Sequence, residues 1–118
     1  MRNFRNWDVY RNAKNLTVVI YQITKDFPDT ERSGLISQIR RASVSIVANI
    51  AEGAGRVTER DFKHFLTMAL GSAFEVEALI EVSDDLKFLE EESKIKTLVN
   101  LEVIQKLLNA FITKLSVT

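Results

Sequence analysis

Few residues of this chain have the type and spacing for chemistry. The single histidine, His64, follows Asp61 by three residues, so the two side chains would share one face of a helix. Di-iron sites in helical bundles need two Glu-x-x-His motifs, and there is no second histidine and no cysteine. The serines Ser43, Ser45 and Ser72 have no histidine at a suitable distance to activate them. We therefore expect a non-enzymatic protein without a catalytic residue, metal site or cofactor.

A row of polar side chains runs beside an apolar stripe in residues 38–53. Ile39, Ile46 and Ile50 recur at helical spacing and predict a core face. We expect the polar side chains to form a seam against the next helix, called here the polar seam: Gln38, Arg41, Ser45, Asn49, Glu52, Ser72 and Glu75. Buried polar groups are usually hydrogen-bonded, so a structural network is the first interpretation, and a ligand or partner site is the alternative.

Two carboxylates of the polar seam, Glu52 and Glu75, could face each other across two helices. Such a pair can act as an acid–base device. A bridge to Arg41 or Arg56 is the stronger expectation, because buried charges are usually partnered.

Basic residues gather in sequence around residues 40–63. Arg40, Arg56, Arg60 and Lys63 are candidate contacts to the phosphates of RNA or DNA. An ordinary solvated surface with structural bridges is the competing interpretation. The chain has 16 basic and 16 acidic residues, and this neutrality counts against strong nucleic-acid binding unless the charge is unevenly distributed.

Helices must position these side chains, since the chain has one proline and four glycines in 118 residues. Apolar periodicity predicts helices over residues 7–24, 33–52, 58–86 and 90–115. Thr58 is expected to cap the third helix, Gly53 to end the second in a left-handed conformation, and Gly71 to contact another backbone. Short links favour one domain over residues 1–118, an all-α, antiparallel up-and-down four-helix bundle with a left-handed twist.

The last predicted helix has more apolar surface than one bundle core requires. Leu101, Ile104 and Leu108 form one stripe, and Ile95 and Val99 belong to a second. The surplus predicts a homo-oligomer. No apolar run is long enough to span a membrane, and residues 1–10 are polar and charged, so a cytoplasmic protein is expected.

Two blocks of sequence resemble a known family. The run QIRRASVSIVANIAEGAGR at residues 38–56 and the pattern DFxxFLxxAxGSxxE at residues 61–75 are similar to the signature of the 23S ribosomal RNA intervening-sequence proteins. Val47 stands where that family often has proline, so the second helix should be straighter. The resemblance implies a homopentameric barrel, an origin within intervening sequences of bacterial 23S ribosomal RNA genes, and no established catalytic role.

Two functions remain open from the sequence. The first is a structural module that associates with nucleic acid, and the second is a protein–protein adaptor or assembly scaffold that has no affinity for nucleic acid.

Overall fold

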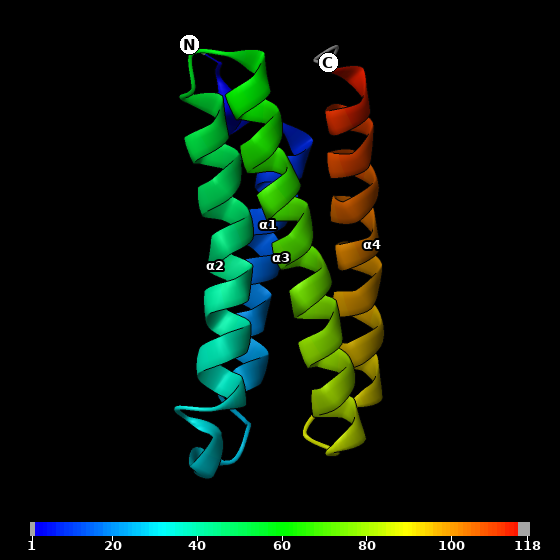
Figure 1. Cartoon of the computed structure of the whole chain (residues 1–118). Helices are drawn as coiled ribbons and strands as arrows, with labels where there is room; N and C mark the ends of the chain where they lie inside the picture. Colours follow the sequence, from blue (N-terminus) through cyan, green and yellow to red (C-terminus); the bar gives the residue numbers. More distant parts are fainter. Residues whose placement is uncertain (1, 116–118) are drawn as a thin grey trace.

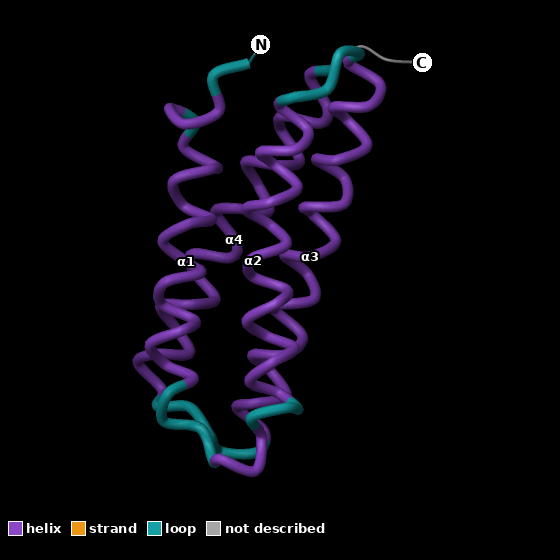
Figure 2. The backbone as a smooth tube through the Cα atoms, turned by 90° about the vertical axis from the view of Figure 1, so that its left-hand side faces the viewer, coloured by secondary structure: helices purple, strands orange, loops and turns teal. Residues whose placement is uncertain are grey.

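Four long helices lie antiparallel in an all-α, up-and-down bundle of 44 × 24 × 24 Å (Figure 1). The computed structural model describes residues 2–115, and within these residues no helix is both long and apolar enough to cross a membrane. Figure 2 shows the links between helices at the two ends of the bundle. The elements are η1 (Phe4–Asn6), α1 (Asp8–Thr24), η2 (Asp29–Glu31), α2 (Leu35–Ala54), α3 (Glu59–Asp85) and α4 (Glu91–Lys114).

All four predicted helices are present, each with ends within two residues of the expected positions. The Thr58 hydroxyl accepts a hydrogen bond from the Asp61 amide at 3.1 Å, which confirms the predicted cap of α3. α2 begins at Leu35, two residues later than expected. Its Leu35 amide donates to the Glu31 carboxylate at 3.1 Å, so a side chain from η2 serves the first turn of α2.

The core consists of one apolar stripe from each helix. Each stripe steps by three and four residues, which keeps it on one face. The fully covered side chains of largest volume are Leu16, Ile20, Ile39, Ile46, Ile50, Phe62, Leu66, Val76, Ile80, Leu101, Ile104 and Leu108. Trp7, Phe62 and Phe111 pack together at one end, with ring centroids 4.9–5.8 Å apart. These contacts hold α1, α3 and α4 at the end where the α2–α3 link lies.

The expectations for two glycines are wrong. Gly53 lies inside α2, and no glycine of residues 2–115 has a positive φ. Gly53 is instead the point of close helix approach, since a Cβ there would lie 2.9 Å from the Phe65 Cβ. Gly71 is exposed, and a Cβ on it would meet no atom within 4 Å. The close approach of α2 and α3 therefore depends on Gly53.

The link between α3 and α4 contains a residue in the left-handed backbone conformation. Lys87 has φ 64°, the one positive value among non-glycine residues of the described chain. Beyond it, Lys94 of α4 forms a 2.8 Å ion pair with Asp84 of α3. The hydrogen bond from Lys94 and the charge of Asp84 raise the pKa of Lys94 above its usual value. The pair thus ties the start of α4 to the end of α3.

Candidate nucleic-acid interface and polar seam

The centre of the polar seam is a hydrogen-bonded cluster between α2 and α3. The Asn49 side-chain amide donates to the Ser45 carbonyl at 2.9 Å and to the Ser45 hydroxyl at 3.0 Å. The Ser72 hydroxyl donates to the Ser45 hydroxyl oxygen at 2.9 Å. The Ser45 hydroxyl therefore accepts two hydrogen bonds, and its own hydrogen remains to be donated to another group.

The remaining polar-seam residues are exposed and lie around this cluster. Gln38, Arg41 and Glu75 line a hollow of about 440 Å³ together with Ala42 and Ser45. The hollow is open to solvent, so the structure brings these side chains together on a surface. Four of the seven polar-seam residues, namely Gln38, Arg41, Glu52 and Glu75, are exposed.

The expected bridges from Glu52 and Glu75 to Arg41 or Arg56 are wrong. In residues 2–115 the ion pairs involve other side chains. The side chains of the expected bridges are all exposed: Arg41, Glu52, Arg56 and Glu75. Water solvates their charges, and holding two such side chains in one geometry costs side-chain entropy. Arg41 and Glu75 thus face one hollow without neutralising each other.

The charges of the chain are divided between the two ends of the bundle. The basic half, residues 2–16, 45–72 and 103–115, carries nine Lys or Arg and four Asp or Glu, a net side-chain charge of +5. The acidic half, residues 17–44 and 73–102, carries seven Lys or Arg and twelve Asp or Glu, a net side-chain charge of −5. In Figure 1 the basic half is the end that holds both labelled termini. An overall neutral chain therefore has a basic end.

Three of the four candidate phosphate contacts lie in the basic half. Arg56 is on the α2–α3 link, and Arg60 and Lys63 lie in the first turns of α3. The guanidinium carbon of Arg56 lies 4.4 Å from the centre of the Phe65 ring. This cation–π contact holds the Arg56 side chain along the start of α3.

Arg40 is remote from the other three. Its Nε donates to the Thr24 hydroxyl at 2.9 Å, and its Nη2 donates to the Tyr21 carbonyl at 3.3 Å. Fourteen residues of α2 separate Arg40 from Ala54, about 21 Å along the helix. Arg40 therefore binds the last turn of α1, in the acidic half.

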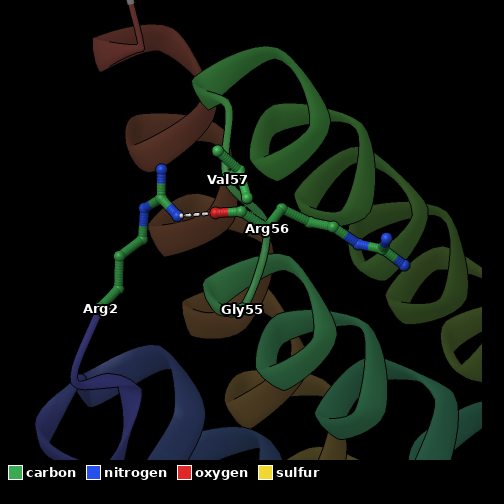
Figure 3. A pocket seen from close by; sticks show the side chains of 4 residues that line it. All are labelled: Arg2, Gly55, Arg56 and Val57. Carbon is green, nitrogen blue, oxygen red and sulfur yellow. Dashed lines mark hydrogen bonds between the residues drawn. The ribbon is translucent and has the colours of Figure 1, made fainter.

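Arg2 joins the basic end, although no sequence motif indicates it. Its Nη1 donates to the Arg56 carbonyl at 2.7 Å, and its guanidinium carbon lies 4.2 Å from the centre of the Phe62 ring. Figure 3 shows the Arg2 and Arg56 guanidinium groups on opposite sides of the link. With Gly55 and Val57 these arginines line a hollow of about 460 Å³. Arg2 follows no helical periodicity, so no pattern could have identified it.

His64 is exposed beside the Phe65 ring. In residues 2–115 no group of three or more His, Asp or Glu side chains is arranged to hold a metal ion. The basic end of the bundle offers positively charged side chains and hydrogen-bond donors, and these groups suit the binding of a ligand.

A protein-family model and a solved crystal structure both match this chain. A family model described as "23S rRNA-intervening sequence protein" matches residues 5–110. No curated protein matches the chain. A crystal structure of a protein of unknown function from the S23 ribosomal protein family, from Bacteroides thetaiotaomicron, superposes with a TM-score of 0.80 at 26% identity. The match covers 88% of this chain and 97% of that one.

Proposed function

The chain belongs to the 23S rRNA-intervening sequence protein family, and from this premise we propose that it is a non-enzymatic, self-associating bundle that binds nucleic-acid phosphates through its basic half. The observation that carries the proposal is the division of charge, +5 against −5. Phosphate binding depends on the local density of Lys and Arg, since each contact releases counterions from the nucleic acid. Net neutrality of the whole chain is therefore compatible with a basic contact surface.

Arg56, Arg60 and Lys63 are the proposed contacts. They are exposed or half-buried, and none forms an ion pair within residues 2–115. The stacking of Arg56 on Phe65 limits the freedom that its guanidinium would lose on binding. Arg40 is left out of the interface because its nitrogens bind α1. The acidic residues interspersed in α3 favour weak binding that is sensitive to salt.

A titration of labelled 23S ribosomal RNA fragments and duplex DNA at about 50 to 200 mM salt tests this proposal. Replacing Arg56, Arg60 and Lys63 together by Gln should reduce the slope of log K against log[salt] by about 2 to 3, because each lost phosphate contact contributes about 0.7 to 0.9. The matched control replaces Lys25, Arg32 and Lys87 of the acidic half by Gln and should leave the slope unchanged. Absence of binding at the lowest salt would refute the proposal.

Self-association is the second part of the proposal, and exposed apolar side chains on α4 support it. Ile95, Val99 and Val103 are 52%, 58% and 41% exposed and lie four residues apart. Contiguous exposed apolar residues of this kind can mark a site of protein–protein contact. The family resemblance implies five copies, so we expect a homopentamer. Light scattering should give a mass well above the 13.5 kDa of one chain, and a monomer at micromolar concentration would contradict this part.

A protein–protein adaptor without affinity for nucleic acid is the second candidate, and the same exposed α4 stripe favours it. The RNA titration separates the two candidates, since an adaptor would show no binding at low salt. Either role requires no catalysis. We place the protein in the cytoplasm, where the proposed ribosomal RNA ligand is found.

A further inference from the structure

We propose that the hollow at the α2–α3 link receives an unpaired nucleobase, so that the protein binds single-stranded RNA in preference to a duplex. This hollow, called here the link hollow, has a volume of about 460 Å³ and is lined by Arg2, Gly55, Arg56 and Val57. The inference rests on the proposed phosphate binding and names the form of nucleic acid that the basic half recognises.

Arg2 supplies a planar surface to the link hollow. Its guanidinium carbon lies 4.2 Å from the centre of the Phe62 ring, and Phe62 is only 2% exposed. Because Phe62 covers one face of the guanidinium, the other face remains for a planar ligand. Unpaired RNA bases stack on the planes of arginine side chains as they do on aromatic rings.

Hydrogen bonds hold the Arg2 guanidinium in place and leave donors for a ligand. Nη1 donates to the Arg56 carbonyl at 2.7 Å and to the Ala54 carbonyl at 3.4 Å. These are the hydrogen bonds of the Arg2 side chain within residues 2–115, so Nε and Nη2 can donate to an oxygen of a base or a phosphate. The arginine is therefore positioned before the ligand arrives, which lowers the entropy cost of binding.

Val57 adds an apolar surface beside this plane. Its side chain is 96% exposed, more than any other large apolar side chain in residues 2–115. Figure 3 shows Val57 on the link between the Arg2 and Arg56 side chains. Proteins that hold an unstacked base commonly place it against aromatic or apolar side chains. A base in the link hollow would cover Val57 and remove this apolar surface from water.

The link hollow selects against a duplex because a paired base has both faces stacked on its neighbours. A duplex offers phosphates and groove edges, so it cannot use the face of Arg2 or the side chain of Val57. A single strand can place one base in the link hollow while its phosphates meet Arg56 and Arg60. Glu59 and Asp61 lie among these cations and weaken phosphate binding, so contact with a base adds affinity that charge alone does not supply.

Two probes with equal charge isolate the contribution of the base. One is an oligouridylate of about ten nucleotides, and the other is the same ribose–phosphate chain without bases. Since both carry the same phosphates, a difference in affinity reports contact with bases. The unaltered chain should bind the oligouridylate more tightly by about fivefold or more, as expected for one stacked base.

Arg2→Lys and Val57→Ser assign this preference to the link hollow. Lysine retains the positive charge of Arg2 and loses its plane, so the affinity for the base-free chain should be unchanged while the preference for oligouridylate decreases toward one. Val57→Ser should have the same effect without any change in charge. The matched controls Arg32→Lys and Val18→Ser replace exposed residues of the acidic half and should retain the full preference. Circular dichroism should show equal helicity for all four variants.

The outcomes separate this inference from the proposed function. If the unaltered chain binds neither probe at the lowest salt, phosphate binding fails and the base site with it. Equal binding of the two probes would leave phosphate binding in place and overturn the base site. A preference that persists in Arg2→Lys or in Val57→Ser would show that the bases bind outside the link hollow.

Discussion

Gly53→Ala is the substitution for which the structure gives the clearest steric consequence. The added methyl group would lie 2.9 Å from the Phe65 Cβ, 3.2 Å from the Phe62 Cδ1 and 3.4 Å from the Phe62 carbonyl oxygen. The Phe65 Cβ is bonded directly to the backbone of α3, so a side-chain rotation cannot relieve the contact. α2 and α3 must separate by several tenths of an ångström at a buried position.

The expected loss of stability combines two opposing effects. Overpacking of this kind costs about 1–3 kcal/mol. Alanine gains up to about 1 kcal/mol over glycine within a helix, and less at Gly53 because it is the second-last residue of α2. We therefore expect a net destabilisation of about 1–2 kcal/mol. Gly71→Ala is the control, because it makes the same replacement in the middle of a helix without a steric contact, and it should stabilise the protein by about 1 kcal/mol.

Thermal unfolding followed by circular dichroism, at one protein concentration, measures the difference. A change of 1 kcal/mol corresponds to about 3–5 °C in Tm for a chain of this size. The Tm of Gly53→Ala should decrease and that of Gly71→Ala should increase. Equal Tm values for the two variants would show that α2 and α3 do not meet at Gly53, and would refute the account of their packing.

Three further substitutions test local contacts. Asn49→Leu removes two hydrogen bonds to Ser45 and should cost about 1 kcal/mol; an unchanged urea midpoint would place Asn49 outside the network. Thr58→Ala removes the cap of α3 and should cost about 0.5–2 kcal/mol, whereas Thr58→Ser should retain most of it. The raised pKa of Lys94 means that its pair with Asp84 contributes fully below pH 10.5 and is lost as pH rises through the higher folded value. Asp84→Asn should therefore remove part of the alkaline decline in stability, and an identical pH profile would contradict this role.

The helices could be predicted from the sequence because every one has a regular apolar stripe. Ile39, Ile46 and Ile50 are all fully buried, as their spacing indicates. The exposure of Gly71 could also have been predicted from the apolar pattern. Gly71 lies two residues from the buried Ala69 and two from the buried Ala73. Two residues correspond to a rotation of about 200° around the helix, so Gly71 points away from the core. The prediction of a close contact followed the residue type and neglected this angle.

The candidate site was less predictable than the fold. The polar centre of Ser45, Asn49 and Ser72 follows from helical spacing, since all three face the neighbouring helix. Ion pairs between different helices, such as the expected bridges from Glu52 and Glu75, do not follow from spacing within one helix, because long exposed side chains choose among many rotamers with little difference in free energy. The division of charge between the two ends depends on the antiparallel order of the helices, and it could be counted only once that order was known.

Assembly and nucleic-acid binding should be coupled if both proposals hold. A ring about an axis along the bundle would place the basic halves of all copies on one side, so weak contacts from several copies could engage one RNA at once. Val99→Glu puts a charge among the exposed apolar side chains of α4, far from Arg56, Arg60 and Lys63 in sequence. We expect it to lower the assembly state, to leave helicity unchanged, and to weaken RNA binding by about tenfold or more through the loss of multivalency. Equal RNA affinities for the monomeric variant and the unaltered chain would show that one copy supplies the whole interface.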